Sequence, residues 1–156
     1  MRLALLAALF VSCVRPAPLH LPDGGPPRDG AGIETSCMGS HCYVLLPEAQ
    51  TWARASLSCA EHGGHVVVVG SADEEAAVWS FASRAEMPVW IGATDEGSEG
   101  TWRWVDAEAW SPMWGPGQPD NAAMGENCAA MWAAFDGAWA DVSCDAMLPV
   151  VCEIEP

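Results

Sequence analysis

The sequence predicts an α+β fold. Three features support this prediction: two helical segments come first along the chain, short strand-like segments follow, and one long loop separates the later strands. With 156 residues, the chain is long enough for one domain with its own hydrophobic core and for a terminal tail. The sequence contains no internal repeat.

The first 36 residues are predicted to lie outside the folded domain. Residues 1–13 are predicted to be an export signal, because Arg2 is followed by an apolar stretch too short to span a bilayer. Residues 14–36, rich in Pro and Gly, are predicted to be a disordered tether. The segment ending at Cys13 resembles the lipobox of bacterial lipoprotein signals, so the sequence leaves open whether Cys13 is lipidated or the chain is simply secreted. A lipid on Cys13 is the one predicted link to a membrane.

Two helices are predicted between residues 51 and 84. Thr51 is the expected N-cap of the first helix, which runs from residue 52 to about residue 62 and ends at a pair of glycines. Ser71 and Glu74 have the spacing of a capping box, which opens a second helix that ends near Arg84.

Short runs of β-branched and aromatic residues, bounded by turn residues, predict the strands. Cys37 and Cys42 lie five positions apart, a spacing that suits a tight hairpin closed by a disulfide. The predicted strands are residues 43–46, 65–69, 89–93 and 101–105.

The composition limits the classes of partner and the compartment. Six basic and 21 acidic residues give a formal net charge of −15, which argues against nucleic acid and anionic membrane as partners. The acidic side chains either gather cations or simply form a soluble surface. Seven cysteines without zinc-like pairs predict an exported, oxidised protein. Without Cys13, the remaining six allow fifteen disulfide pairings, among which the residues alone do not choose.

The long loop carries the side chains of a predicted calcium site. Gln118, Asp120, Glu126 and Asp141 supply amide and carboxylate oxygens, the ligands that Ca²⁺ prefers. A Gly-x-Ser-x-Gly, a His-Glu-x-x-His and a phosphate-binding loop are all missing from the sequence, so the chain is predicted not to be an enzyme.

Several short motifs, in order and spacing, resemble the C-type lectin domain. The resemblance covers roughly residues 37–153 and implies two helices flanking antiparallel sheets, a long calcium-binding loop and three disulfides, in the long form with an N-terminal hairpin pair. The predicted domain is therefore residues 37–156. The motifs are Trp90-Ile91-Gly92, Gln118-Pro119-Asp120, Glu126-Asn127-Cys128, Trp139-Ala140-Asp141 and Val151-Cys152-Glu153.

The resemblance also implies pairings and roles for individual residues. The implied disulfides are Cys37–Cys42, Cys59–Cys152 and Cys128–Cys144. The implied ligands of a principal Ca²⁺ are Gln118, Asp120, Glu126 and Asp141, with a cis peptide before Pro119; the first three would also bind sugar. An auxiliary Ca²⁺ site would draw on Asp95, Glu99, Asn121 and Asn127, together with Glu126.

Two functions follow as hypotheses. The first is calcium-dependent carbohydrate binding by an exported or surface-anchored lectin domain, whose partners are glycans or glycoproteins; the Gln-Pro-Asp triplet resembles the galactose type. The second is a C-type lectin-like module that binds protein without recognising sugar. Ala140 favours the second hypothesis, because the family has an asparagine there that binds both the ion and the sugar.

The nine tryptophans are predicted to serve mainly the core. Trp110 and Trp114 flank the long loop and are candidates for ligand contact. The expected core positions are Trp90, Trp102, Trp104 and Trp139.

Overall fold

The described part of the chain contains two α-helices, two 3₁₀ turns and one eight-stranded sheet. The computed structural model describes residues 34–122 and 125–154, and the predicted export signal, Cys13 and most of the predicted tether lie outside this part. The helices are α1 (Trp52–Glu61) and α2 (Ala72–Ala82), and the 3₁₀ turns are η1 (Ser83–Ala85) and η2 (Ala133–Phe135). The strands are β1 (Glu34–Met38), β2 (His41–Gln50), β3 (His65–Val66), β4 (Val89–Thr94), β5 (Arg103–Trp104), β6 (Cys128–Met131), β7 (Trp139–Val142) and β8 (Leu148–Ile154).

The strands form a single mixed sheet in the order β1-β2-β8-β4-β6-β7, with β3 paired to β8 and β5 paired to β4. The α+β class and the two flanking helices are confirmed. The expected antiparallel arrangement holds for every pair except β4 and β8, which run parallel at Trp90 and Val150. This parallel pair joins the two halves of the sheet.

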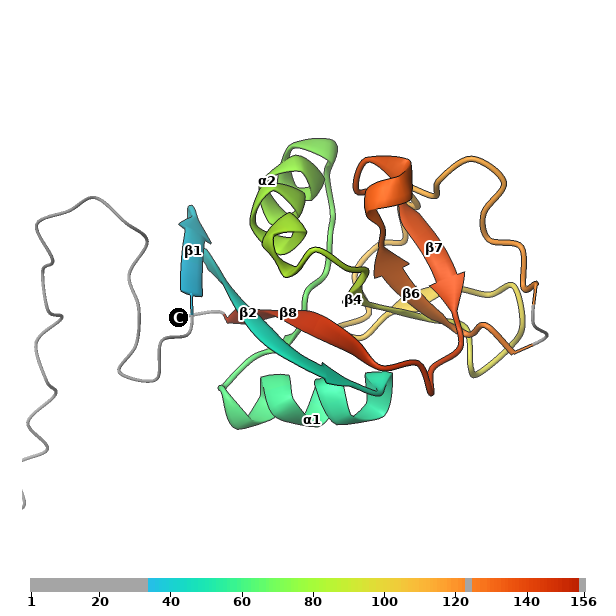
Figure 1. Cartoon of the computed structure of the whole chain (residues 1–156), viewed down its shortest axis with the longest axis horizontal. Helices are drawn as coiled ribbons and strands as arrows, with labels where there is room; N and C mark the ends of the chain where they lie inside the picture. Colours follow the sequence, from blue (N-terminus) through green and yellow to red (C-terminus); the bar gives the residue numbers. More distant parts are fainter. Residues whose placement is uncertain (1–33, 123–124, 155–156) are drawn as a thin grey trace, which may run out of the picture.

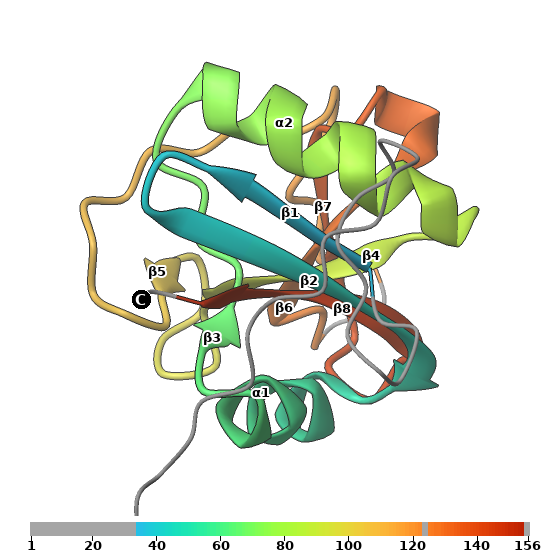
Figure 2. The same ribbon diagram turned by 90° about the vertical axis from the view of Figure 1, so that its left-hand side faces the viewer.

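The two helices cover opposite faces of the sheet, α1 below and α2 above in the view of Figure 1 and again in Figure 2. Successive side chains of a strand point to opposite faces. Tyr43 and Leu45 of β2 therefore join the core under α2, whereas Val44 and Leu46 join the core against α1. The sheet is buried on both faces, which explains the apolar runs in its central strands.

Side-chain caps start both helices at the predicted residues. The Thr51 hydroxyl accepts a hydrogen bond from the Arg54 N–H at 3.4 Å, and the Ser71 hydroxyl accepts one from the Glu74 N–H at 3.2 Å. The reciprocal half of the predicted capping box is shifted by one residue, because the Glu74 carboxylate accepts from the Gly70 N–H at 2.9 Å.

Two predicted strands are shorter in the structure. Of residues 65–69 only β3 is a strand, because the Val68 N–H is donated to the Glu153 carboxylate at 3.1 Å instead of to a neighbouring strand. Residues 67–69 are still fully or almost fully buried. Residues 101–105 likewise reduce to the two-residue β5. At the N-terminal end, β1 begins three residues before the predicted domain start at Cys37.

Three disulfides join cysteines of the described residues, and they are the pairs that the family resemblance implies: Cys37–Cys42, Cys59–Cys152 and Cys128–Cys144. The second ties α1 to β8 and the third ties the start of β6 to the segment after β7. Within the two described ranges, no helix is both long enough and apolar enough to cross a membrane.

The disulfides should differ in their contribution to stability. Cys59 and Cys152 are 93 positions apart and Cys37 and Cys42 only five, so the first constrains the unfolded chain much more. We expect replacement of Cys59 and Cys152 by Ala to lower the free energy of unfolding by about 4 to 5 kcal/mol, and replacement of Cys37 and Cys42 by about 2 kcal/mol. Equilibrium unfolding in urea measures both losses, and equal losses would contradict this account.

Candidate functional site

Three carboxylates from two separate segments meet at one end of the sheet. Asp120 and Glu126 lie on the loop that leads into β6, and Asp141 lies on β7. One oxygen from each carboxylate lies within 4.8 Å of the others. This loop occupies the right-hand end of the molecule in Figure 1. Asp120 is exposed, Glu126 is half-buried and Asp141 is only 4% exposed.

Hydrogen bonds attach the loop to β7. The Asp141 carboxylate accepts from the Asp120 N–H at 3.0 Å with one oxygen and from the Asn121 N–H at 2.7 Å with the other. In return, the Gln118 side-chain oxygen accepts from the Asp141 N–H at 3.2 Å. The Gln118–Pro119 peptide is cis, as the resemblance implies. Gln118, Asp120 and Asp141 are thereby held together at the same end of the domain.

A second set of hydrogen bonds joins Asn121 to the residues that precede β6. The Asn121 side-chain oxygen accepts from the Gly125 N–H at 2.7 Å and from the Glu126 N–H at 3.1 Å. The backbone of Asn121 has a φ of 43°, in the left-handed region that Asn tolerates better than most residues. Residues 123 and 124, between these contacts, are outside the described ranges.

Of the predicted auxiliary site, the structure places Asp95 and Asn127 side by side. Asp95 is 2% exposed, and its N–H is donated to the Asn127 carbonyl at 3.1 Å. One carboxylate oxygen of Asp95 accepts from the Gly100 N–H at 2.6 Å. The other, together with the side-chain oxygen of Asn127, is buried without a hydrogen-bond partner among the described residues. Glu99 is exposed, and the Asn121 oxygen is engaged within the loop.

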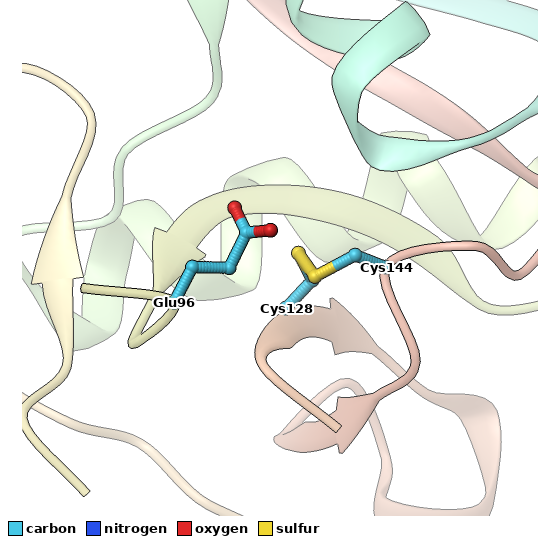
Figure 3. A group of neighbouring side chains, drawn as sticks. All are labelled: Glu96, Cys128 and Cys144. Atoms are coloured by element: carbon cyan, nitrogen blue, oxygen red, sulfur yellow. A yellow bond between two sulfur atoms is a disulfide. The ribbon is translucent and has the colours of Figure 1, made fainter. Parts of the chain in front are cut away.

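A second group of nearby ligand-type atoms is not a metal site. Figure 3 shows the carboxylate of Glu96 beside Cys128 and Cys144. Glu96 is exposed, and one ligand-type atom from each of the three residues lies within 4.8 Å of the others. The two sulfurs are joined in a disulfide, and the sulfur ligand of a metal is a thiolate. The group therefore has only the Glu96 carboxylate to offer a cation.

Several tryptophan rings pack against one another next to the loop. Trp139, fully buried, packs edge-on against Trp104 at 5.1 Å and against Trp114 at 5.8 Å between ring centroids. The four tryptophans that the sequence assigns to the core are all buried. Trp110 and Trp114, predicted as candidates for ligand contact, are half-buried and pack against the core cluster that contains Trp104 and Trp139. Trp110 and Trp114 belong to the segment between β5 and β6, so the packing of their rings against Trp139 attaches this segment to β7.

Sequence patterns gave no indication of a polar cavity of about 150 Å³ near the start of β2 and the end of β8. His41, Glu74 and Glu153 are among the residues that line it, and the Nδ1 of His41 lies 2.5 Å from a Glu153 oxygen. The Tyr43 hydroxyl donates to Glu74 at 2.7 Å, and burial together with this carboxylate raises the pKa of Tyr43 above its usual range. These residues are far apart in sequence, so no local pattern could reveal the cavity.

Comparison with known proteins identifies the family. The chain matches the family described as Lectin C-type domain over residues 48–154. Human C-type lectin domain family 4 member D is 32% identical over 126 residues, which cover 78% of this chain and 58% of that protein. Hepatic lectin of Gallus gallus is 35% identical over 115 residues, which cover 72% of this chain and 54% of that protein. The cow C-type carbohydrate-recognition domain of CD23, solved in the presence of GlcNAc2Man3 oligosaccharide, has a TM-score of 0.73 at 29% identity, with 78% of this chain and 93% of that chain covered.

The chain therefore belongs to the Lectin C-type domain family, as its motifs predicted. It spans a little over half the length of each of the two curated relatives named above. Because members of this family are non-enzymatic binding proteins, the chain is a binding domain and not an enzyme.

The hydrogen bonds between the buried Asp141 carboxylate and the loop should contribute to stability. In Asp141→Asn one of the two acceptor oxygens becomes an NH₂ group, which faces a backbone N–H that it cannot accept from. We expect a loss of about 1 to 3 kcal/mol in the free energy of unfolding, measured by urea titration with a calcium chelator present. Asp120→Asn is the control, because Asp120 is exposed and needs one acceptor only, for the Ala122 N–H. Equal losses in the two variants would contradict the attachment.

Proposed function

We propose that this domain binds Ca²⁺ through Gln118, Asp120, Glu126 and Asp141, and binds a carbohydrate through that ion. The observation that carries the proposal is the convergence of three carboxylate oxygens within 4.8 Å. Like charges this close repel one another, and a divalent cation between them would remove the repulsion. The sequence between residues 104 and 156 contains no Arg, so this segment has no guanidinium group that could neutralise the carboxylates in place of the cation.

The hydrogen bonds of the loop are compatible with ion binding. A carboxylate offers about four lone-pair sites, and a side-chain amide oxygen offers two. Asp141 uses one site on each oxygen for a backbone N–H, and Gln118 uses one. Each side chain therefore keeps a lone pair for Ca²⁺, which takes six to eight oxygen ligands and accepts water in the remaining positions.

Sugar binding is proposed from the family. Two neighbouring hydroxyls of a glycan would replace water on the ion and form hydrogen bonds with Gln118, Asp120 and Glu126. The cow CD23 domain, similar to this chain, was solved in the presence of an oligosaccharide, which supports a glycan or glycoprotein as the partner. The order of amide and carboxylate in Gln118-Pro119-Asp120 supports a galactose-type preference, because that order sets which hydroxyl meets a donor and which an acceptor.

An auxiliary Ca²⁺ is proposed at Asp95 and Asn127, with Glu99 reaching it from the surface. Each of the first two residues has a buried oxygen without a donor, and a buried unpaired oxygen is costly unless a cation or water satisfies it.

The domain is further proposed to act outside the cell, after an export signal within residues 1–13. Lipidation of Cys13 stays a prediction, and the animal relatives named above do not support a bacterial lipoprotein.

A protein-binding module is the second candidate, and Ala140 is the observation that favours it. Ala140 lies on β7 next to Asp141 and is 1% exposed. Its methyl group offers no oxygen to an ion and no N–H to a sugar. Loss of one such contact weakens binding by about 1 to 3 kcal/mol, enough to remove sugar binding of modest affinity while the fold remains.

Calcium binding should stabilise the folded protein. We expect the melting temperature of the purified protein to rise with the logarithm of the Ca²⁺ concentration above the Kd, and the free energy of unfolding to increase by about 2.7 kcal/mol at a concentration 100 times the Kd. Glu126→Gln and Asp120→Ala should lose most of this response, whereas Glu48→Gln, at an exposed position on β2, should keep it. Absence of a response in the unsubstituted protein at several millimolar Ca²⁺, or an unchanged response in Glu126→Gln, would rule out the site.

The two candidate functions differ in their dependence on the ion. If a glycan binds through Ca²⁺, then retention on galactoside and mannoside resins should disappear when a chelator is added. Binding to a protein ligand through the fold alone should persist under the same conditions. The decisive result for the second candidate would be a partner captured equally well with and without chelator, together with no retention on either resin in Ca²⁺.

A further inference from the structure

Asn121 occupies the junction of the candidate site. Its N–H is donated to Asp141 at 2.7 Å, and its side-chain oxygen accepts from the Glu126 N–H at 3.1 Å. One residue thus connects two of the three carboxylate-bearing residues, and it directly follows the third, Asp120. The family resemblance assigns this position to the auxiliary ion, but here the oxygen that would bind an ion already accepts two hydrogen bonds.

We propose that Asn121 is a positioning residue: its side-chain amide acts as a clamp that holds Glu126 against Asp120 and Asp141, in place of a contact with a second ion. The inference rests on the proposed calcium site, because the clamp matters for function only if Glu126 is a ligand. Residues that orient ligands without touching the metal typically change metal affinity by 10- to 100-fold when they are replaced.

The chemistry of asparagine suits this role. Three carboxylates already face one another at the site. An aspartate at position 121 could accept the same two N–H groups, but it would add a fourth negative charge beside them. The amide supplies the acceptor without the charge. Asparagine also tolerates the left-handed backbone at this position, where φ is 43°.

Hydrogen exchange in the presence of a chelator tests the clamp directly. We expect the amide protons of Gly125 and Glu126 to exchange about tenfold faster in Asn121→Gly and Asn121→Ala than in the unsubstituted protein, because their acceptor is gone. Glycine relieves the backbone strain that alanine introduces at this φ, so an effect common to both variants belongs to the missing side chain. Asn121→Asp should keep the slow exchange, since it retains the acceptor oxygen.

Calorimetric Ca²⁺ titration of the same proteins tests the functional consequence. The glycine and alanine variants should bind Ca²⁺ about 10- to 100-fold more weakly, with no change in the number of ions bound per chain. Unchanged exchange at Gly125 and Glu126 in both variants would overturn the clamp, whether or not the protein binds calcium. Loss of one bound ion with unchanged exchange would show that Asn121 is itself a ligand. If the protein binds no Ca²⁺ but the variants show the predicted exchange, the hydrogen bonds of the clamp are supported. The proposed calcium site, and with it the role of the clamp in ion binding, is then overturned.

Discussion

The hydrogen bonds between the buried carboxylate of Asp141 and the backbone of Asp120 and Asn121 are the constraint on which the candidate site depends. A charged group that is 4% exposed needs donors, and here it finds them on the loop. The position of the loop is therefore determined by β7, and β7 is determined by the sheet. Changes that leave all four proposed ligands intact but move β7 should still disturb the site.

The core and the site share one short strand. On β7, Trp139 is packed among the tryptophan rings and Asp141, two residues later on the same face, meets the loop. Burial of the rings thus fixes the direction of the carboxylate. Ala140, between them, points to the opposite, packed face of the sheet and pairs with Ala130 of β6. A larger side chain at position 140 would have to fit into that packed face, so restoring an asparagine there is a change to the core as well as to the site.

The sequence predicted those features that depend on local patterns or on motifs in order. The caps at Thr51 and Ser71 follow from side-chain chemistry, and the convergence of Asp120, Glu126 and Asp141 follows from the family's spacing. The pairing of the cysteines also came from the family and not from the residues themselves. Features that depend on distant partners were not predictable. The strand at 65–69 is cut short by Glu153, 85 positions away from Val68. The clamp at Asn121 was not predicted for a different reason: the family resemblance assigns Asn121 to an ion site, so the sequence suggests a metal ligand and not a hydrogen-bond acceptor within the loop.

The chain enters and leaves the domain at the end opposite to the loop. Cys42, near the start of β2, pairs with Ile154 at the end of β8. This end of the β2–β8 pair lies at the left in Figure 1, whereas the loop lies at the right. Anything joined to either end of the domain would therefore attach behind the site and leave the loop facing outward. Several copies gathered on one stem or surface could engage a glycan array together, and this geometry would convert modest single-site affinity into strong attachment.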